Sequence, residues 1–131
     1  MTNKNMIVYG EFSVEEIINI INVDTTHRVP LPSNGKTYHV RVNSDRLVLF
    51  SKNRTCVSCG LTGSLFRLES SSKKDPLPHL NLYAKIKDKL VLMTKDHIYP
   101  KSKGGSDKSF NLQTMCHNCN NLKADSVPNS S

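Results

Sequence analysis

The C-terminal third of the chain gathers residue types that suit the hydrolysis of a phosphodiester. Asp96 and His97 are adjacent at the end of an apolar run, and Asn120 follows a Gly/Pro-rich loop and a Cys-x-x-Cys pair. Such a reaction needs a group that removes a proton from water near neutral pH, and histidine titrates in that range. It also needs a hard cation, which takes carboxylate and amide oxygens as ligands. The pattern offers His97 as the base, and Asp96 with Asn120 as metal ligands.

Four cysteines form two Cys-x-x-Cys pairs, Cys56 with Cys59 and Cys116 with Cys119. Each spacing lets two thiolates bind one tetrahedral zinc ion, so the four together predict a structural zinc site. Two disulfides in a secreted protein are the alternative. The segment 1–10 carries no signal-peptide pattern, which favours a reducing, cytoplasmic compartment and therefore metal.

The composition is basic and rather polar. The 131 residues carry a net charge of +7, and 37% of them are hydrophobic. A positive chain attracts polyanions, so nucleic acid is the expected partner, with an ordinary solvated basic surface as the alternative. No apolar run approaches the roughly 18 residues of a membrane span, so no membrane association is expected. A short polar chain buries a limited core, which is a further reason to expect a metal staple.

The elements that position these residues are predicted from apolar periodicity and turn signals. A helix is expected at 11–23 with Ser13 as its N-cap, followed by a turn-rich link at 29–35. A basic hairpin follows, which either lies along DNA or is simply exposed. Its strands are expected at 37–42 and 46–50. The later elements are expected to be strands at 66–69, 79–83 and 90–94, a loop at 101–111, and a helix from Cys116 to about Ala124.

Taken together, these motifs resemble those of the HNH, or ββα-metal, endonuclease family. The matching motifs are Asp-His-Ile-x-Pro at 96–100, Ser-Lys-Gly-Gly at 102–105, Asn-Leu-Gln at 111–113 and Cys-x-x-Cys-Asn-x-x-Lys at 116–123. Two further stretches, at 59–61 and 78–83, look like small HNH proteins of phages, so the resemblance covers about 55–123. It implies an enzyme, phage-type or homing-like, that hydrolyses DNA phosphodiester bonds by nicking or double-strand cleavage.

The resemblance also implies a role for each motif residue. His97 would be the general base, Asp96 and Asn120 would hold the catalytic ion, and Asn111 would pin the loop that orients the base. The four cysteines resemble the structural site of the zinc-containing branch. Many members carry a histidine where Asn120 stands. Because asparagine is a weaker ligand for soft metals, Mg²⁺ or Mn²⁺ is expected at the catalytic centre.

We therefore expect an α+β fold in which a Cys₄ zinc site staples a ββα-metal unit, with a small N-terminal helix and β-hairpin appendage. The expected division is a possible DNA-contacting appendage at 1–54, a nuclease domain at 55–124 and a disordered tail at 125–131. Three lysines flank the centre as phosphate contacts or as ordinary surface residues: Lys101, Lys103 and Lys123. A monomer and a homodimer are both compatible with the sequence. A non-enzymatic zinc module that binds DNA or a protein is the alternative function, but it leaves Asp96 and His97 without a role.

Overall fold

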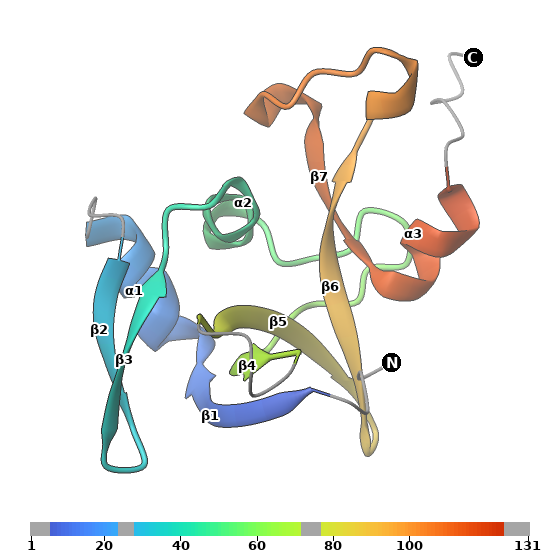
Figure 1. Ribbon diagram of the computed structural model, residues 1–131. Helices are drawn as coiled ribbons and strands as arrows, with labels where there is room; N and C mark the ends of the chain where they lie inside the picture. Colours follow the sequence, from blue (N-terminus) through green and yellow to red (C-terminus); the bar gives the residue numbers. More distant parts are fainter. Residues whose placement is uncertain (1–5, 24–27, 72–76, 125–131) are drawn as a thin grey trace.

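The structure, a computed structural model, describes residues 6–23, 28–71 and 77–124. Its main feature is a five-stranded antiparallel sheet with the strand order β1-β4-β5-β6-β7 (Figure 1). The five strands are β1 (Ile7–Ser13), β4 (Leu65–Ser70), β5 (His79–Ile86), β6 (Lys89–His97) and β7 (Leu112–Cys116). A second sheet consists of β2 (Arg28–Ser33) and β3 (Lys36–Arg41). With the helices described below, the fold confirms the mixed α+β class, and the strands expected at 66–69, 79–83 and 90–94 are present.

Strand β6 takes part in two successive pairings. Its residues 89–92 pair with β5, and its residues 93–97 pair with β7. The β6–β7 end therefore extends beyond the other strands, as Figure 1 shows at the top of the view. The strand expected at 90–94 continues to His97, so Asp96 and His97 lie within the strand and take their orientation from it.

In the described part of the chain, three α-helices accompany the sheet. Helix α1 (Val14–Val23) and helix α2 (Asp45–Lys52) contribute Ile17 and Phe50 to the same hydrophobic core as Leu68 and Met93 of the sheet. Helix α3 (His117–Lys123) contacts β6 and β7. It lies on the opposite face, because it meets Thr94, and neighbouring residues of a strand point to opposite sides. None of the helices in the described part of the chain is long and apolar enough to cross a bilayer.

The helix expected at 11–23 is shorter than predicted. Residues 11–13 belong to β1, where they pair with β4, and the helix begins at Val14. Ser13 is nevertheless its N-cap, since the Glu16 amide donates to Ser13 Oγ at 3.1 Å. The strand was missed because its stability depends on a partner more than fifty residues away in the sequence. Strand β1 pairs with β4, and Ile17 of α1 belongs to the same core as Leu68 of β4; the division of the chain into two domains at 54/55 stays a prediction.

The strand expected at 46–50 is wrong, because these residues form most of α2. Ser44, which lies between the two expected strands, is the N-cap of this helix: its side chain accepts from the Leu47 amide at 3.2 Å. Leu47 and Phe50, three residues apart, are buried on the same helical face. The short apolar run fitted strand and helix alike, and the capping serine decides between them.

The N-terminal hairpin is real but lies earlier in the chain than predicted, since β3 pairs with β2. The segment 29–35, expected to be a link, supplies strand β2 and its turn. Its prolines are tolerated because β2 has a single neighbour, so the missing amide hydrogens disrupt no second ladder. Asn34 and Gly35, with φ angles of 52° and 79°, form the tight connection to β3.

Candidate active site and cysteine cluster

The two Cys-x-x-Cys pairs come together in space. The four Sγ atoms all lie within 4.8 Å of one another, and all four cysteines are free thiols. A tetrahedron of sulfurs about 2.3 Å from a zinc ion has edges of about 3.8 Å. The Cys59 Sγ–Cys116 Sγ distance is 3.8 Å. The cluster is therefore suited to hold a metal ion, as the spacing of the cysteines predicted.

Backbone hydrogen bonds favour the thiolate form of one member of the cluster, Cys56. Burial opposes ionisation of Cys56, but backbone hydrogen bonds from Cys116, Cys59 and Ser58 outweigh it and lower the pKa of the Cys56 thiol to about 6. The knuckle that carries Cys56 closes through a hydrogen bond from the Gly60 amide to the Cys56 carbonyl at 3.0 Å. Gly60 has a φ angle of 79°, which suits glycine.

The end of β6 carries the predicted metal ligand Asp96. Asp96 is only 7% exposed, and one amide and one ammonium group contact its carboxylate. Gln113 Nε2 donates to Asp96 Oδ2 at 2.8 Å from the facing position of β7, and Lys123 Nζ lies 3.2 Å from the same oxygen. Because both contacts fall on Oδ2, they leave Oδ1 as the oxygen with room for another ligand.

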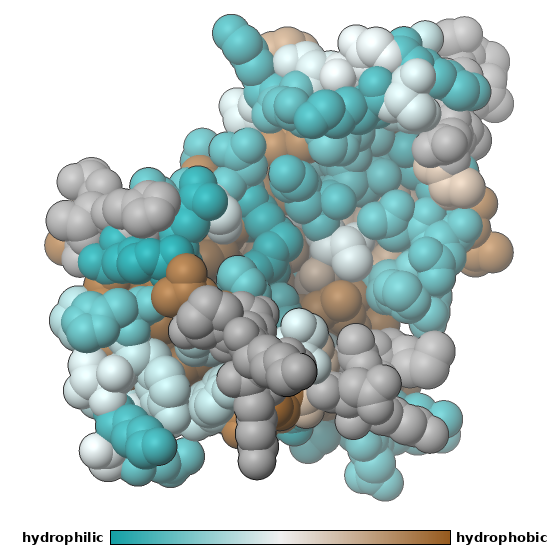
Figure 2. All heavy atoms as spheres, in the orientation of Figure 1, coloured by the Kyte–Doolittle hydropathy of each residue, from teal (hydrophilic) through white to brown (hydrophobic). Residues whose placement is uncertain are grey.

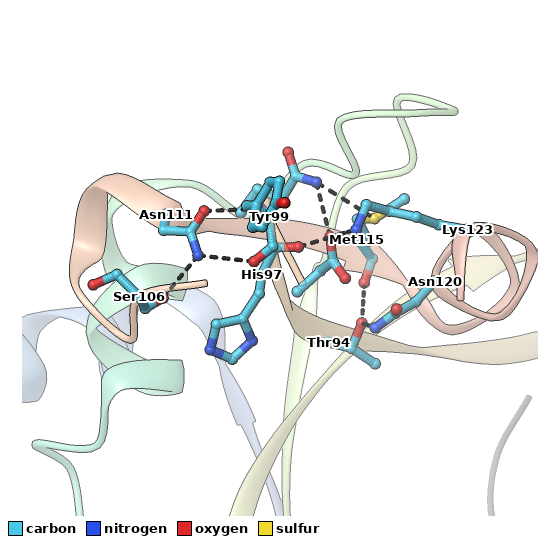
Figure 3. Close-up of polar contacts among 10 residues, drawn as sticks. Thr94, His97, Tyr99, Ser106, Asn111, Met115, Asn120 and Lys123 are labelled. Carbon is cyan, nitrogen blue, oxygen red and sulfur yellow. Dashed lines mark hydrogen bonds and ion pairs between the residues drawn. The ribbon is translucent and has the colours of Figure 1, made fainter. Parts of the chain in front are cut away.

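Asn120 is fixed against β6 by a two-step hydrogen-bond chain (Figure 3). Thr94 Oγ1 donates to the Met115 carbonyl at 2.8 Å, and Asn120 Nδ2 donates to Thr94 Oγ1 at 2.8 Å. A threonine hydroxyl has one hydrogen, which is already given to Met115, so it can only accept from Asn120. The amide nitrogen of Asn120 must therefore face Thr94, and its oxygen is left for a ligand.

Asn111 holds the loop between β6 and β7, as Figure 3 shows. Its Oδ1 accepts from the Tyr99 amide at 2.8 Å, and its Nδ2 donates to the carbonyls of Tyr99 at 3.1 Å and Ser106 at 2.7 Å. The residue is 7% exposed. These contacts tie the start of the loop to its end. Gly105 lies so close to the chain that a Cβ there would stand 1.9 Å from the Tyr99 carbonyl oxygen.

His97 contacts a residue that the sequence did not single out. His97 Nε2 lies 2.8 Å from Asp107 Oδ1, and Lys101 Nζ lies 2.8 Å from Asp107 Oδ2. The hydrogen bonds from Lys101 and from His97 hold the pKa of Asp107 below its usual range. Asp107 is thus a carboxylate when it meets the imidazole.

Three of the four predicted residues of the catalytic centre line one polar cavity of about 410 Å³, and Asn111 does not. Asp96, His97 and Asn120 all contribute to it. Among the described residues that line it, three lysines outnumber the one carboxylate, that of Asp96: Lys95, Lys101 and Lys123. The cavity is therefore positive, which suits a phosphate.

The three lysines predicted to flank the centre differ in their surroundings. Lys123 donates to the His97 carbonyl at 3.0 Å besides meeting Asp96, and its side chain is 15% exposed. Lys101 is paired with Asp107, and Lys103 is exposed in a 3₁₀ turn. Contact of these lysines with DNA stays a prediction. Figure 2 shows hydrophilic residues over most of the projecting β6–β7 end, a surface suited to a polar partner.

A comparison with protein families shows where this site belongs. Residues 84–131 match the family model for HNH endonuclease. This segment belongs to the HNH endonuclease family. Comparisons with curated proteins and with solved structures found no match. The HNH segment contains Asp96, His97, Asn111 and Asn120, and its family implies nuclease activity on DNA. Cys56 and Cys59 precede it, so the cysteine cluster ties the HNH segment to an earlier part of the chain.

Three supporting residues of the HNH segment were missed by reasoning from sequence. Gln113 lies on β7 and Thr94 on β6, two paired strands, and each contacts a predicted metal ligand. Finding them required knowledge of β7, a strand that the sequence analysis did not predict. No sequence pattern around Asp107 indicates its contact with His97, since this contact depends on the path of the whole loop.

Proposed function

We propose that this protein is a metal-dependent endonuclease that hydrolyses phosphodiester bonds in DNA. The observation that carries the proposal is the joint placement of Asp96, His97 and Asn120 around one positive cavity within the HNH segment. Strands β6 and β7 followed by α3 would then be the ββα-metal unit of the family.

The donor set fits a hard divalent cation. Asp96 offers a carboxylate oxygen with room for a ligand, and the Thr94 contact turns the Asn120 amide oxygen away from β6. Oxygen donors of this kind favour Mg²⁺ or Mn²⁺. Once bound by Asp96 and Asn120, the ion would neutralise charge on the scissile phosphate and the leaving oxygen.

The chain's own side chains would carry out the remaining steps. His97 would accept a proton from the attacking water, which makes the water a stronger nucleophile. Asn111 would hold the loop that borders His97, and the lysines of the cavity would attract the DNA backbone. By resemblance to the family, the products would carry 5′-phosphate and 3′-hydroxyl ends.

The cysteine cluster would hold a structural zinc ion. Four thiolates form a closed tetrahedral set that leaves no open position for substrate. The cluster joins the knuckle at 56–60 to the start of α3, the helix that carries Asn120. Zinc would therefore support the catalytic ligand without touching the substrate.

A plasmid assay tests the proposed activity. Supercoiled DNA is incubated with the zinc-loaded protein in Mg²⁺, in Mn²⁺, or in EDTA at a concentration and time that leave the zinc content unchanged. We expect relaxed or linear products with 5′-phosphate ends in the presence of either ion and none in EDTA. The absence of cleavage with every divalent ion, by a protein that still binds the plasmid, would contradict the proposal and favour a DNA-binding zinc module.

A further inference from the structure

The carboxylate of Asp107 has one partner for each oxygen. Oδ1 lies 2.8 Å from His97 Nε2, and Oδ2 lies 2.8 Å from Lys101 Nζ. A carboxylate can only accept hydrogen bonds, and so can only be matched by nitrogens that carry hydrogen. The Lys101 ammonium supplies one, and the hydrogen on the imidazole must then sit on Nε2.

This contact decides which ring nitrogen can act as a base. A neutral imidazole carries one N–H, so a hydrogen on Nε2 leaves the lone pair on Nδ1. We propose that Asp107 is a positioning residue that fixes His97 in the Nε2–H tautomer and so assigns Nδ1 as the atom that takes the proton from water. The proposal rests on the proposed function and deepens it.

The same geometry explains how Asn111 acts on His97 without touching its ring. Within the described part of the chain, the hydrogen bonds of the Asn111 side chain go to the backbone of Tyr99 and Ser106. Ser106 immediately precedes Asp107, so the bond from Asn111 Nδ2 to the Ser106 carbonyl places Asp107 beside the imidazole. Asn111 therefore holds the loop, and Asp107 transmits its position to the ring.

Because Lys101 shares the Asp107 carboxylate with His97, one substitution should change the tautomer of His97 and a second should restore it. In Asp107→Asn, the amide has a single acceptor oxygen. The Lys101 ammonium should hydrogen-bond to this oxygen in preference to the neutral imidazole, because its hydrogen bond is charge-assisted. The amide NH₂ would then face His97 and donate to Nε2, which forces the hydrogen to Nδ1. With Lys101→Met added, the amide can turn its oxygen to His97 and restore the Nε2–H tautomer.

The tautomer can be measured directly and without DNA. In ¹⁵N-labelled, zinc-loaded protein at a pH well above the ordinary histidine pKa of about 6.5, long-range ¹H–¹⁵N spectra distinguish Nδ1–H from Nε2–H. We expect Nε2–H for His97 in the unaltered protein, Nδ1–H in Asp107→Asn, and Nε2–H again in Asp107→Asn/Lys101→Met. An Nδ1–H tautomer in the unaltered protein, or one tautomer in all three proteins, would overturn the proposal.

Single-turnover cleavage gives the functional readout. We expect Asp107→Asn to cut at least about tenfold more slowly, and Asp107→Asn/Lys101→Met to regain a large part of that loss at saturating DNA. A merely structural role would make the double variant no faster than Asp107→Asn, and that result would overturn the proposal. If the unaltered protein did not cleave, or if His97→Ala cleaved at the same rate, the proposed function would fail, and the spectra would still decide the tautomer.

Discussion

At the scale of single residues, Asn120 is the side chain whose proposed role depends most on a neighbour. Its amide nitrogen donates to Thr94, which leaves the oxygen for the proposed catalytic ion. We expect Asn120→Ala to need at least about tenfold more Mg²⁺ or Mn²⁺ for half-maximal cleavage, because one of two protein ligands is lost. Titration of the cleavage rate against each ion measures this.

Asn118→Ala is a matched control, since Asn118 is an exposed asparagine on the same helix. It should leave the metal requirement unchanged. Equal metal dependence of Asn120→Ala and the unaltered protein would show that Asn120 does not bind the ion.

The residues of the centre were predictable to the extent that their motifs are local in sequence. Asp96, His97 and Asn120 line one cavity because their motifs sit on one strand and on the helix that packs against it. Asp107 was not predictable, since nothing in its neighbourhood of glycine and serine requires a contact with His97. The ion pair between Lys123 and Asp96 was not predicted either, because a lysine near a polar centre is first expected to contact phosphate.

At the scale of elements, the loop between β6 and β7 must keep a compact path for Asp107 to reach His97. Gly105 is central to this path: its amide donates to the Pro100 carbonyl at 2.9 Å, and a Cβ would stand 1.9 Å from the Tyr99 carbonyl oxygen. We expect Gly105→Ala to lower the free energy of unfolding by about 1–3 kcal/mol and to slow cleavage, because backbone atoms must move apart. Urea denaturation and the nicking assay measure the two effects.

Ser109→Ala serves as the control within the same loop, because Ser109 is exposed and its loop hydrogen bond is made by its backbone carbonyl. It should change neither quantity. If Gly105→Ala matched it in stability and in rate, the compact loop would not be needed for activity.

Among the elements, strands with clear apolar alternation were predicted and those that depend on distant partners were not. The segments 66–69 and 79–83 bury the apolar residues at every second position, Phe66 with Leu68 and Leu80 with Leu82, and both are strands. Strand β7 has only five residues and ends at Cys116, so its apolar pattern is too short to indicate a strand. The segment 46–50 carried apolar residues that fit either period, and the N-cap Ser44 makes it a helix.

At the scale of the whole molecule, the cysteine cluster brings together two segments that are more than fifty residues apart in the sequence. It connects residues on either side of the β4–β5–β6 sheet segment, from Cys59 in the knuckle to Cys119 in α3. We expect Cys59→Ser to lose the bound zinc and to lower the melting temperature, because the binding energy of a structural metal is part of the folding energy. Metal analysis and thermal denaturation measure the change.

Ser58→Ala is the neighbouring control, since Ser58 is exposed and contributes only its backbone to the knuckle. It should retain zinc and the melting temperature of the unaltered protein. A Cys59→Ser protein with full zinc content and unchanged melting would contradict the structural role of the cluster.

The most direct test of the central claim is the cleavage rate of His97→Ala under saturating DNA and divalent ion. His39→Ala is the matched control, because His39 is an exposed histidine of β3 that does not line the cavity. If His97 removes the proton from the attacking water, its loss should slow cleavage by at least about 100-fold. Zinc content and DNA binding should stay unchanged, and His39→Ala should cut at the full rate. Cleavage by His97→Ala at the rate of the unaltered protein would contradict the account.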